Sequence, residues 1–173
     1  MATGVLATAV VALAQMFTIS VQNNQNARTG GFAVALAEQK MEQLRGLTYG
    51  LDPLGLPLTD NSTDTTQPVE TPTGGLGLTP SPGGTLVANV TGYVDYVDQF
   101  GNILGGGGPT PRPGAVYIRR WSIDPLPTNP NNTLVIQVMV TRNKPRGLAD
   151  QTGSVERLAN EARIISVKTR KAQ

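Results

Sequence analysis

Residues 2–22 have the sequence ATGVLATAVVALAQMFTISVQ, and this stretch decides what kind of fold the chain can adopt. It contains no charged side chain, and its large apolar residues are distributed all round a helix rather than along one face. These residues are Val5, Leu6, Val10, Val11, Leu13, Met16, Phe17, Ile19 and Val21. Because a helix without a polar face needs shelter from water, we expect residues 1–22 to lie in a membrane or in a protein core.

Length and polarity bear on which of these surroundings is favoured. About twenty helical residues, each rising about 1.5 Å, just cross a hydrocarbon core. Four polar side chains favour protein surroundings over lipid: Thr3, Thr8, Gln15 and Thr18. A secretory signal peptide is the alternative, with a small-x-small cleavage pattern at residues 12–14, but no Lys or Arg precedes the apolar run as such a peptide requires.

Residues 23–50 begin with a polar stretch and then show the stripe of an amphipathic helix. Val34, Ala37, Met41 and Leu44 are spaced by three and four residues, which predicts one apolar face packed on a core. Glu38, Glu42 and Arg45 fall on the wet side. We expect one long helix with a bend or a locally unwound stretch at residues 30–31, both Gly, and the alternative is two helices joined there.

The rest of the chain predicts a β-rich head. Residues 51–84 are rich in Pro, Gly, Thr, Asp and Ser, so we expect a long irregular loop. Residues 85–173 are expected to form the sheet, with strand candidates at 85–97, 115–123, 134–140 and 162–169. Ile136 and Val138 lie on the apolar face of the third, which should be central, and Ile165 and Val167 are expected to point inward from the fourth.

Together these elements predict an α+β fold. A long N-terminal α-helix has its C-terminal half packed on a four-stranded antiparallel sheet, and its apolar first half projects from the head. The predicted core between helix and sheet contains Val34, Ala37, Met41, Leu44, Ile136 and Val138. A projecting apolar helix favours association with lipid or with copies of itself.

Composition excludes several kinds of chemistry. The chain has no Cys and no His, so thiol nucleophiles, thiolate metal sites and histidine-based catalysis are absent. The net charge is only +2, which does not indicate a specific nucleic-acid partner, and we take the basic C-terminus, with Lys168, Arg170 and Lys171, as a frayed tail. Glu38 and Glu42 share a helical face, but no substrate-binding aromatic residues accompany them. We therefore expect this face to be exposed to solvent, and we do not expect the protein to be an enzyme.

The only cofactor that the sequence brings into question is calcium. Asp60, Asn61 and Asp64 are weak candidate ligands, although their order is not that of an EF-hand loop and solvated loop acids are the simpler interpretation. Asp95, Asp98 and Asn102 invite the same idea, with turn formation as the simpler role of the last two. For Trp121, flanked by Arg119 and Arg120, burial in the core is favoured over stacking on a base or sugar.

The chain resembles the type IV pilin and type II secretion pseudopilin superfamily, above all its minor pilins of the type IV pilus modification type. Three segments and one strand carry the likeness: GVLATAVVALAQ at residues 4–15, the polar stretch ending at residues 27–28, the pattern A-x-x-L-A-x-x-x-M-E-x-L-R at 33–45, and YIRRW at 117–121. The family's leader, its cleavage-site glycine and its conserved glutamate are absent. We therefore expect the sequence to begin inside the helix, just downstream of that glutamate.

The resemblance implies a bacterial structural protein rather than an enzyme. It implies a subunit that waits in the inner membrane and then joins a periplasmic pseudopilus or an extracellular, cell-surface pilus. Its partners would be other pilin subunits, held through the apolar N-terminal helix. The alternative that we keep is a membrane-anchored extracytoplasmic binding module or adhesin, whose long loop and sheet recognise a ligand.

Overall fold

The computed structural model describes residues 2–143 and 161–170, and the side chains of residues 2–10 and 26 lie outside the description. Helix α1 (Ala2–Gly46) is continuous over its 45 residues. The expectation of a locally unwound stretch at Gly30 and Gly31 is therefore wrong, and so is the alternative of two helices. Each glycine weakens a helix by about 1 kcal/mol relative to alanine but does not forbid helical geometry. The helical turns on both sides of the pair keep these two residues helical.

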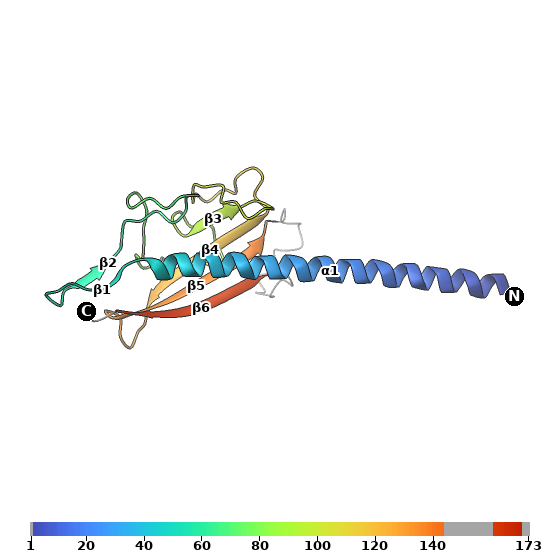
Figure 1. Ribbon diagram of the computed structural model, residues 1–173, viewed down its shortest axis with the longest axis horizontal. Helices are drawn as coiled ribbons and strands as arrows, with labels where there is room; N and C mark the ends of the chain where they lie inside the picture. The colour runs from blue at the N-terminus through green and yellow to red at the C-terminus, as the bar shows by residue number, and fades with distance from the viewer. Residues whose placement is uncertain (1, 144–160, 171–173) are drawn as a thin grey trace.

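A four-stranded antiparallel sheet packs against the second half of α1 (Figure 1). Its strands are β3 (Val94–Val97), β4 (Tyr117–Pro125), β5 (Thr133–Arg142) and β6 (Ala162–Thr169), in that spatial order. The predicted α+β architecture is thus observed, and β5 lies inside the sheet as expected. The first strand is much shorter than the predicted 85–97, because residues 85–93 form turns and Gly92 adopts a φ of +85°.

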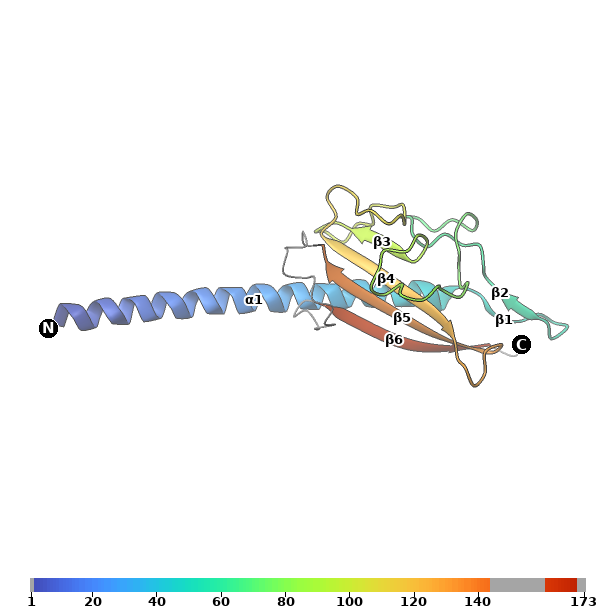
Figure 2. The ribbon, with the colours of Figure 1, turned by 180° about the vertical axis from the view of Figure 1, so that it is seen from behind.

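The stretch between helix and sheet is not wholly irregular. β1 (Tyr49–Leu51) and β2 (Pro57–Thr59) form an antiparallel hairpin at the end of the head farthest from the N-terminus (Figures 1 and 2). The carboxylate of Asp52 closes it by accepting hydrogen bonds from the backbone N–H groups of Leu54 (2.9 Å) and Leu56 (2.7 Å). The expectation of an irregular loop from residue 51 was therefore wrong for this hairpin.

The core lies between α1 and one face of the sheet. Ala37, Met41 and Leu44 are buried there in the same cluster as Ile136 and Val138. Val34 is 43% exposed, which corrects its predicted place in the core. The centre of the buried stripe runs through Ala33, Leu36, Ala37, Lys40 and Leu44, so Val34 falls at its margin.

Strand β6 presents the opposite face from the one predicted. Ile165 and Val167 are each 59% exposed on the outer face of the sheet, and Ile164 packs on the core. In the observed register Ile164 pairs with Val138, and a shift of one residue moves every side chain of a strand to the other face. Because Ile164 and Ile165 are adjacent, either face of β6 could be turned to the core if hydrophobicity alone decided.

Candidate functional site

The first half of α1 projects from the head as an isolated helix, and we call its apolar part the rod (residues 2–22; Figure 1). All large apolar side chains described in the rod are exposed: Val11, Leu13, Met16, Phe17, Ile19 and Val21. Phe17 and Met16 are 71% and 70% exposed, respectively. Val5, Leu6 and Val10, which were predicted to belong to the same surface, lie outside the described side chains. The described rod is an apolar surface without a partner in the monomer.

The rod carries little polarity that would oppose burial. The first charged side chain of the helix is that of Arg28, beyond the end of the rod. The hydroxyl of Thr18 donates to the carbonyl oxygen of Ala14 at 3.0 Å, so it already has a hydrogen-bond acceptor within the helix. A hydroxyl satisfied in this way lowers the free energy needed to remove it from water. The rod is therefore suited to a dry protein–protein contact.

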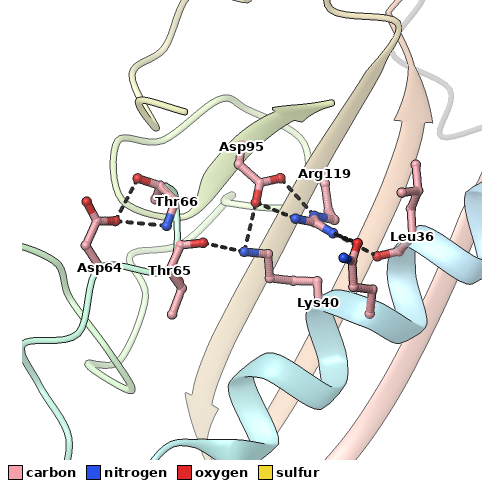
Figure 3. Close-up of polar contacts among 8 residues, drawn as sticks. Leu36, Lys40, Asp64, Thr65, Thr66, Asp95 and Arg119 are labelled. Atoms are coloured by element: carbon pink, nitrogen blue, oxygen red, sulfur yellow. Dashed lines mark hydrogen bonds and ion pairs between the residues drawn. The ribbon is translucent and has the colours of Figure 1, made fainter. Parts of the chain in front are cut away.

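A cluster of buried charges fastens α1 to the sheet, and we call it the ion cluster (Lys40, Asp95 and Arg119; Figure 3). The Arg119 guanidinium on β4 donates to both oxygens of Asp95 on β3, each at 2.8 Å. The Lys40 ammonium on α1 lies 2.8 Å from Asp95 Oδ2. All three side chains are fully buried, so two cations share one carboxylate inside the head.

The remaining donors of the ion cluster reach other elements. Arg119 Nη1 donates to the Leu36 carbonyl and to Gln39 Oε1, both on α1 and both at 3.1 Å. Lys40 Nζ donates to the Thr65 carbonyl at 2.5 Å (Figure 3). It also lies 4.4 Å from the centroid of the Trp121 ring. The cluster thus joins the helix, two strands and the loop around residue 65 at a single point.

The surroundings of the ion cluster shift its titration. Burial lowers the pKa of Lys40 from 10.5 to about 8, although the negative charge of Asp95 acts in the opposite direction. Burial by itself would raise the pKa of Asp95, but the adjacent charges of Lys40 and Arg119 outweigh it and hold that pKa below 3.8. Asp95 is therefore ionised at neutral pH, and Lys40 is protonated with less margin than an exposed lysine.

A second attachment holds the C-terminal end of α1. Lys168 Nζ on β6 donates to the carbonyl oxygens of Arg45 and Leu47, the latter at 2.6 Å, where the helix leaves its last carbonyls unpaired. A cation there also complements the helix dipole. Arg170 donates to the carbonyls of Gly50 and Leu58 at 3.0 Å and packs 4.1 Å over the ring of Tyr49. These two basic residues are structural, which corrects the expectation of a frayed tail; Lys171 lies outside the described residues.

The weak calcium candidates are engaged in their own turns. Asp60 accepts hydrogen bonds from the backbone of Ser62 and Thr63 and from the Thr63 hydroxyl at 2.6 Å. Although partial burial acts against it, these bonds lower the pKa of Asp60. Asp64 accepts bonds from the N–H and the hydroxyl of Thr66, and Asn61 is exposed. Within residues 2–143 and 161–170, no group of three or more His, Cys, Asp or Glu side chains is placed to hold a metal ion.

The other candidates divide between core and surface. Asp95 belongs to the ion cluster, so the calcium interpretation is wrong for it, and Asp98 and Asn102 form a turn. Trp121 is fully buried, in the core as expected. Glu38 and Glu42 are exposed, and Glu42 pairs with Arg45 at 3.2 Å.

Sequence reasoning missed the ion cluster. Lys40 stands in the buried stripe between Ala37 and Leu44, and a lysine in the middle of an apolar stripe was the available signal. Its partners lie 55 and 79 positions further along the chain, on two different strands, and no local pattern connects them to it.

Comparison of the chain with protein-family models, with curated proteins and with solved structures found no match. Among the described residues, no helix combines the length and the hydropathy needed to cross a membrane.

Proposed function

We propose that the chain is a structural subunit of a pilin-type filament, either a type IV pilus or a type II secretion pseudopilus. It polymerises through the rod and has no catalytic role. The observation that carries the proposal is the rod itself, an uncharged helix whose described apolar side chains are exposed in the monomer. The sequence resemblance to minor pilins supports the same assignment.

The energetics of rod burial support polymerisation. Each large apolar side chain stabilises by about 1.5–3 kcal/mol when it is fully buried. The described rod exposes six of them, and association requires about 4–15 kcal/mol to offset lost translational and rotational freedom. Full burial of the six among several neighbouring rods amounts to about 9–18 kcal/mol, which is comparable with or larger than this cost, and a contact that buries half of them supplies about half as much.

The attachment of the rod to the head supports a mechanical role. The ion cluster and Lys168 hold the second half of α1 to the sheet at two separate points, near Lys40 and beyond Arg45. Force applied along the rod is thereby transmitted to the sheet through buried ion pairs and hydrogen bonds as well as apolar contacts. Before assembly, the proposal places the rod in the inner membrane; after assembly, the head faces the periplasm or the cell exterior.

The test compares the full chain with two variants of equal charge change. Phe17→Asp puts a carboxylate in the middle of the rod, and Asn24→Asp puts the same group on the exposed polar segment that follows the apolar stretch. After removal of detergent, we expect filaments from the native chain and from Asn24→Asp, but none from Phe17→Asp, by negative-stain electron microscopy and sedimentation.

Deletion of residues 1–22 provides a second arm. The resulting head should be a soluble monomer, with the fluorescence of buried Trp121 showing that it is folded. Filaments formed by this head or by Phe17→Asp would contradict the assignment of the rod as the polymerising element. A native chain that stays as single copies in lipid would favour the anchored binding module instead.

A further inference from the structure

An aromatic side chain stands out from the head at the end nearest the rod. Phe100 is 76% exposed, at the tip of the turn formed by residues 98–102. The Asp98 carboxylate accepts hydrogen bonds from the N–H groups of Phe100 (2.8 Å) and Asn102 (2.9 Å), and Gly101 adopts a φ of +92°. The Asn102 side chain and these backbone donors lower the pKa of Asp98, so the turn is negatively charged at neutral pH. Phe100 is therefore held outward by a hydrogen-bonded turn.

A groove of about 570 Å³ lies at the opposite end of the head. It runs between the C-terminal end of α1, the β1–β2 hairpin and β6, and it is lined by residues that include Tyr49, Leu51, Leu58 and Val167. Leu58 is 48% exposed, so apolar surface is open to solvent there. Its volume lies within the range of small-molecule sites, about 300–1,000 Å³, so it has room for an aromatic side chain.

The aromatic turn and the groove are too far apart to meet within one chain. A Cβ atom on Gly101 would lie 3.4 Å from Phe32 and 3.9 Å from Leu36, whereas the groove begins at Arg45. At about 1.5 Å per residue, these places are separated by about 14–20 Å along the helix axis. In both ribbon views β3, which precedes the turn, points toward the rod, and the hairpin lies at the far end (Figures 1 and 2).

The charges of the two surfaces are complementary. The residues that line the groove include Arg45 and Lys168 but no carboxylate. Glu42, outside the lining, pairs with Arg45, which leaves an excess of one positive charge there. The turn from residue 98 to residue 102 carries Asp98 and no cation. A heterologous contact between such surfaces, at opposite ends of one molecule, extends into a linear array because it does not close on itself.

We propose that the Phe100 turn of one subunit inserts into the groove of the next, so that heads stack end to end along the filament. This inference rests on the proposed function, since the occupant of the groove is a second copy of the chain brought into line by rod packing. Phe100 acts as an aromatic anchor whose turn is already ordered, which reduces the entropy lost on contact. Asp98 approaches the cationic rim around Arg45 and sets the polarity of stacking.

The absence of cysteine from the chain permits a direct test. The full chain with Gln99→Cys and Leu58→Cys keeps Phe100 and carries one thiol in its turn and one in the groove lining at the other end of the head. A disulfide forms only where Cα atoms approach within about 7 Å. Mild oxidation of its filaments should give a ladder of covalent dimers, trimers and longer species on a non-reducing gel. The matched control is Gln99→Cys with Val87→Cys, because Val87 is 63% exposed and lies outside the groove lining.

The outcomes separate this inference from the proposed function. A ladder from the double variant with Gln99→Cys and Leu58→Cys, with none from the control, supports end-to-end stacking. Filaments without a ladder, or equal ladders from both double variants, overturn the stacking contact and leave the rod-driven filament intact. A native chain that forms no filaments overturns both.

Discussion

Lys40, Asp95 and Arg119 place two positive charges and one negative charge in the interior of the head. Taking charges out of water is expensive, and their mutual attraction offsets that only when the geometry is good and the other donors are satisfied. Here the spare donors reach Leu36, Gln39 and Thr65. Such a cluster adds little net stability compared with apolar residues in the same places. It does fix how α1, β3 and β4 are aligned, because the three charged side chains can meet in only one alignment of these elements.

Removal of the shared carboxylate should be the most damaging single change in the ion cluster. Asp95→Asn leaves two buried cations without a counter-charge, and we expect a loss of about 3–5 kcal/mol in the free energy of unfolding. Lys40→Met should lower the free energy of unfolding by less, because Asp95 keeps its bidentate ion pair with Arg119. Denaturant unfolding followed by the fluorescence of Trp121, the only tryptophan, measures both.

Glu38→Gln, at an exposed position on the same helix, is the control and should change stability by less than about 0.5 kcal/mol. If Lys40→Met proved as destabilising as Asp95→Asn, the carboxylate would not be the centre of the cluster.

The lowered pKa of Lys40 predicts a pH dependence with a definite sign. Burial brings that pKa to about 8 in the folded state, against 10.5 for an ordinary lysine, so the unfolded chain binds more protons between these values. The free energy of unfolding should therefore rise with pH through this contribution. We expect the rise between about pH 8 and 9.5, below the range in which the tyrosines titrate.

The measurement is a series of unfolding curves across that window, for the native sequence and for Lys40→Met. The variant lacks the titrating group, so its stability should depend less on pH. Parallel profiles for the two proteins would show that Lys40 titrates normally.

At the scale of elements, one side chain of β6 caps the C-terminal end of α1. Lys168 provides the donor that the last carbonyls of α1 lack. Lys168→Met keeps most of the side-chain length but removes the charge and the hydrogen bonds, and we expect a loss of about 1–2 kcal/mol in the free energy of unfolding.

Arg163→Met, on the exposed face of the same strand, is the matched control and should lose much less. Thermal unfolding monitored by circular dichroism compares the two. Equal effects would mean that Lys168 acts as an ordinary surface cation.

Periodicity was a good guide to some elements and a poor guide to others. Leu134, Ile136 and Val138 recur at every second position around the polar Gln137, so the inward face of β5 was predictable. In β6, Ile164 and Ile165 are adjacent, and the observed face depends on pairing with Val138 and on the reach of Lys168 to the helix end. The β1–β2 hairpin escaped prediction because its strands of three residues are too short for a period to show.

At the scale of the whole molecule, the rod and the head differ in what drives their contacts. Rod packing buries apolar surface, which salt does not weaken, whereas the contact between the Asp98 turn and the Arg45 rim is partly electrostatic and is screened by salt. Filaments should therefore persist in about 1 M sodium chloride, where the Debye length is about 3 Å, and dissociate in a nonionic detergent.

Sedimentation after each treatment is the measurement, with the native chain in low salt as its reference. Dissociation by salt alone would indicate that charge pairs, and not the rod, hold the filament together.

The division between rod and packed helix followed from the sequence by itself, because the absence of charge from residue 2 to residue 27 and the stripe from Ala33 to Leu44 are local features that a helix displays directly. The layered α+β arrangement was also predictable from the sequence. One amphipathic helix and a few apolar strands have few ways to bury their apolar faces against each other. The tertiary structure alone decided which charges meet in the core and which face β6 presents. The ion cluster and the orientation of β6 both depend on residues that are far apart in the chain and meet only in the folded protein. There the free energy of packing, and not the local hydrophobic pattern, decides which side chains are buried.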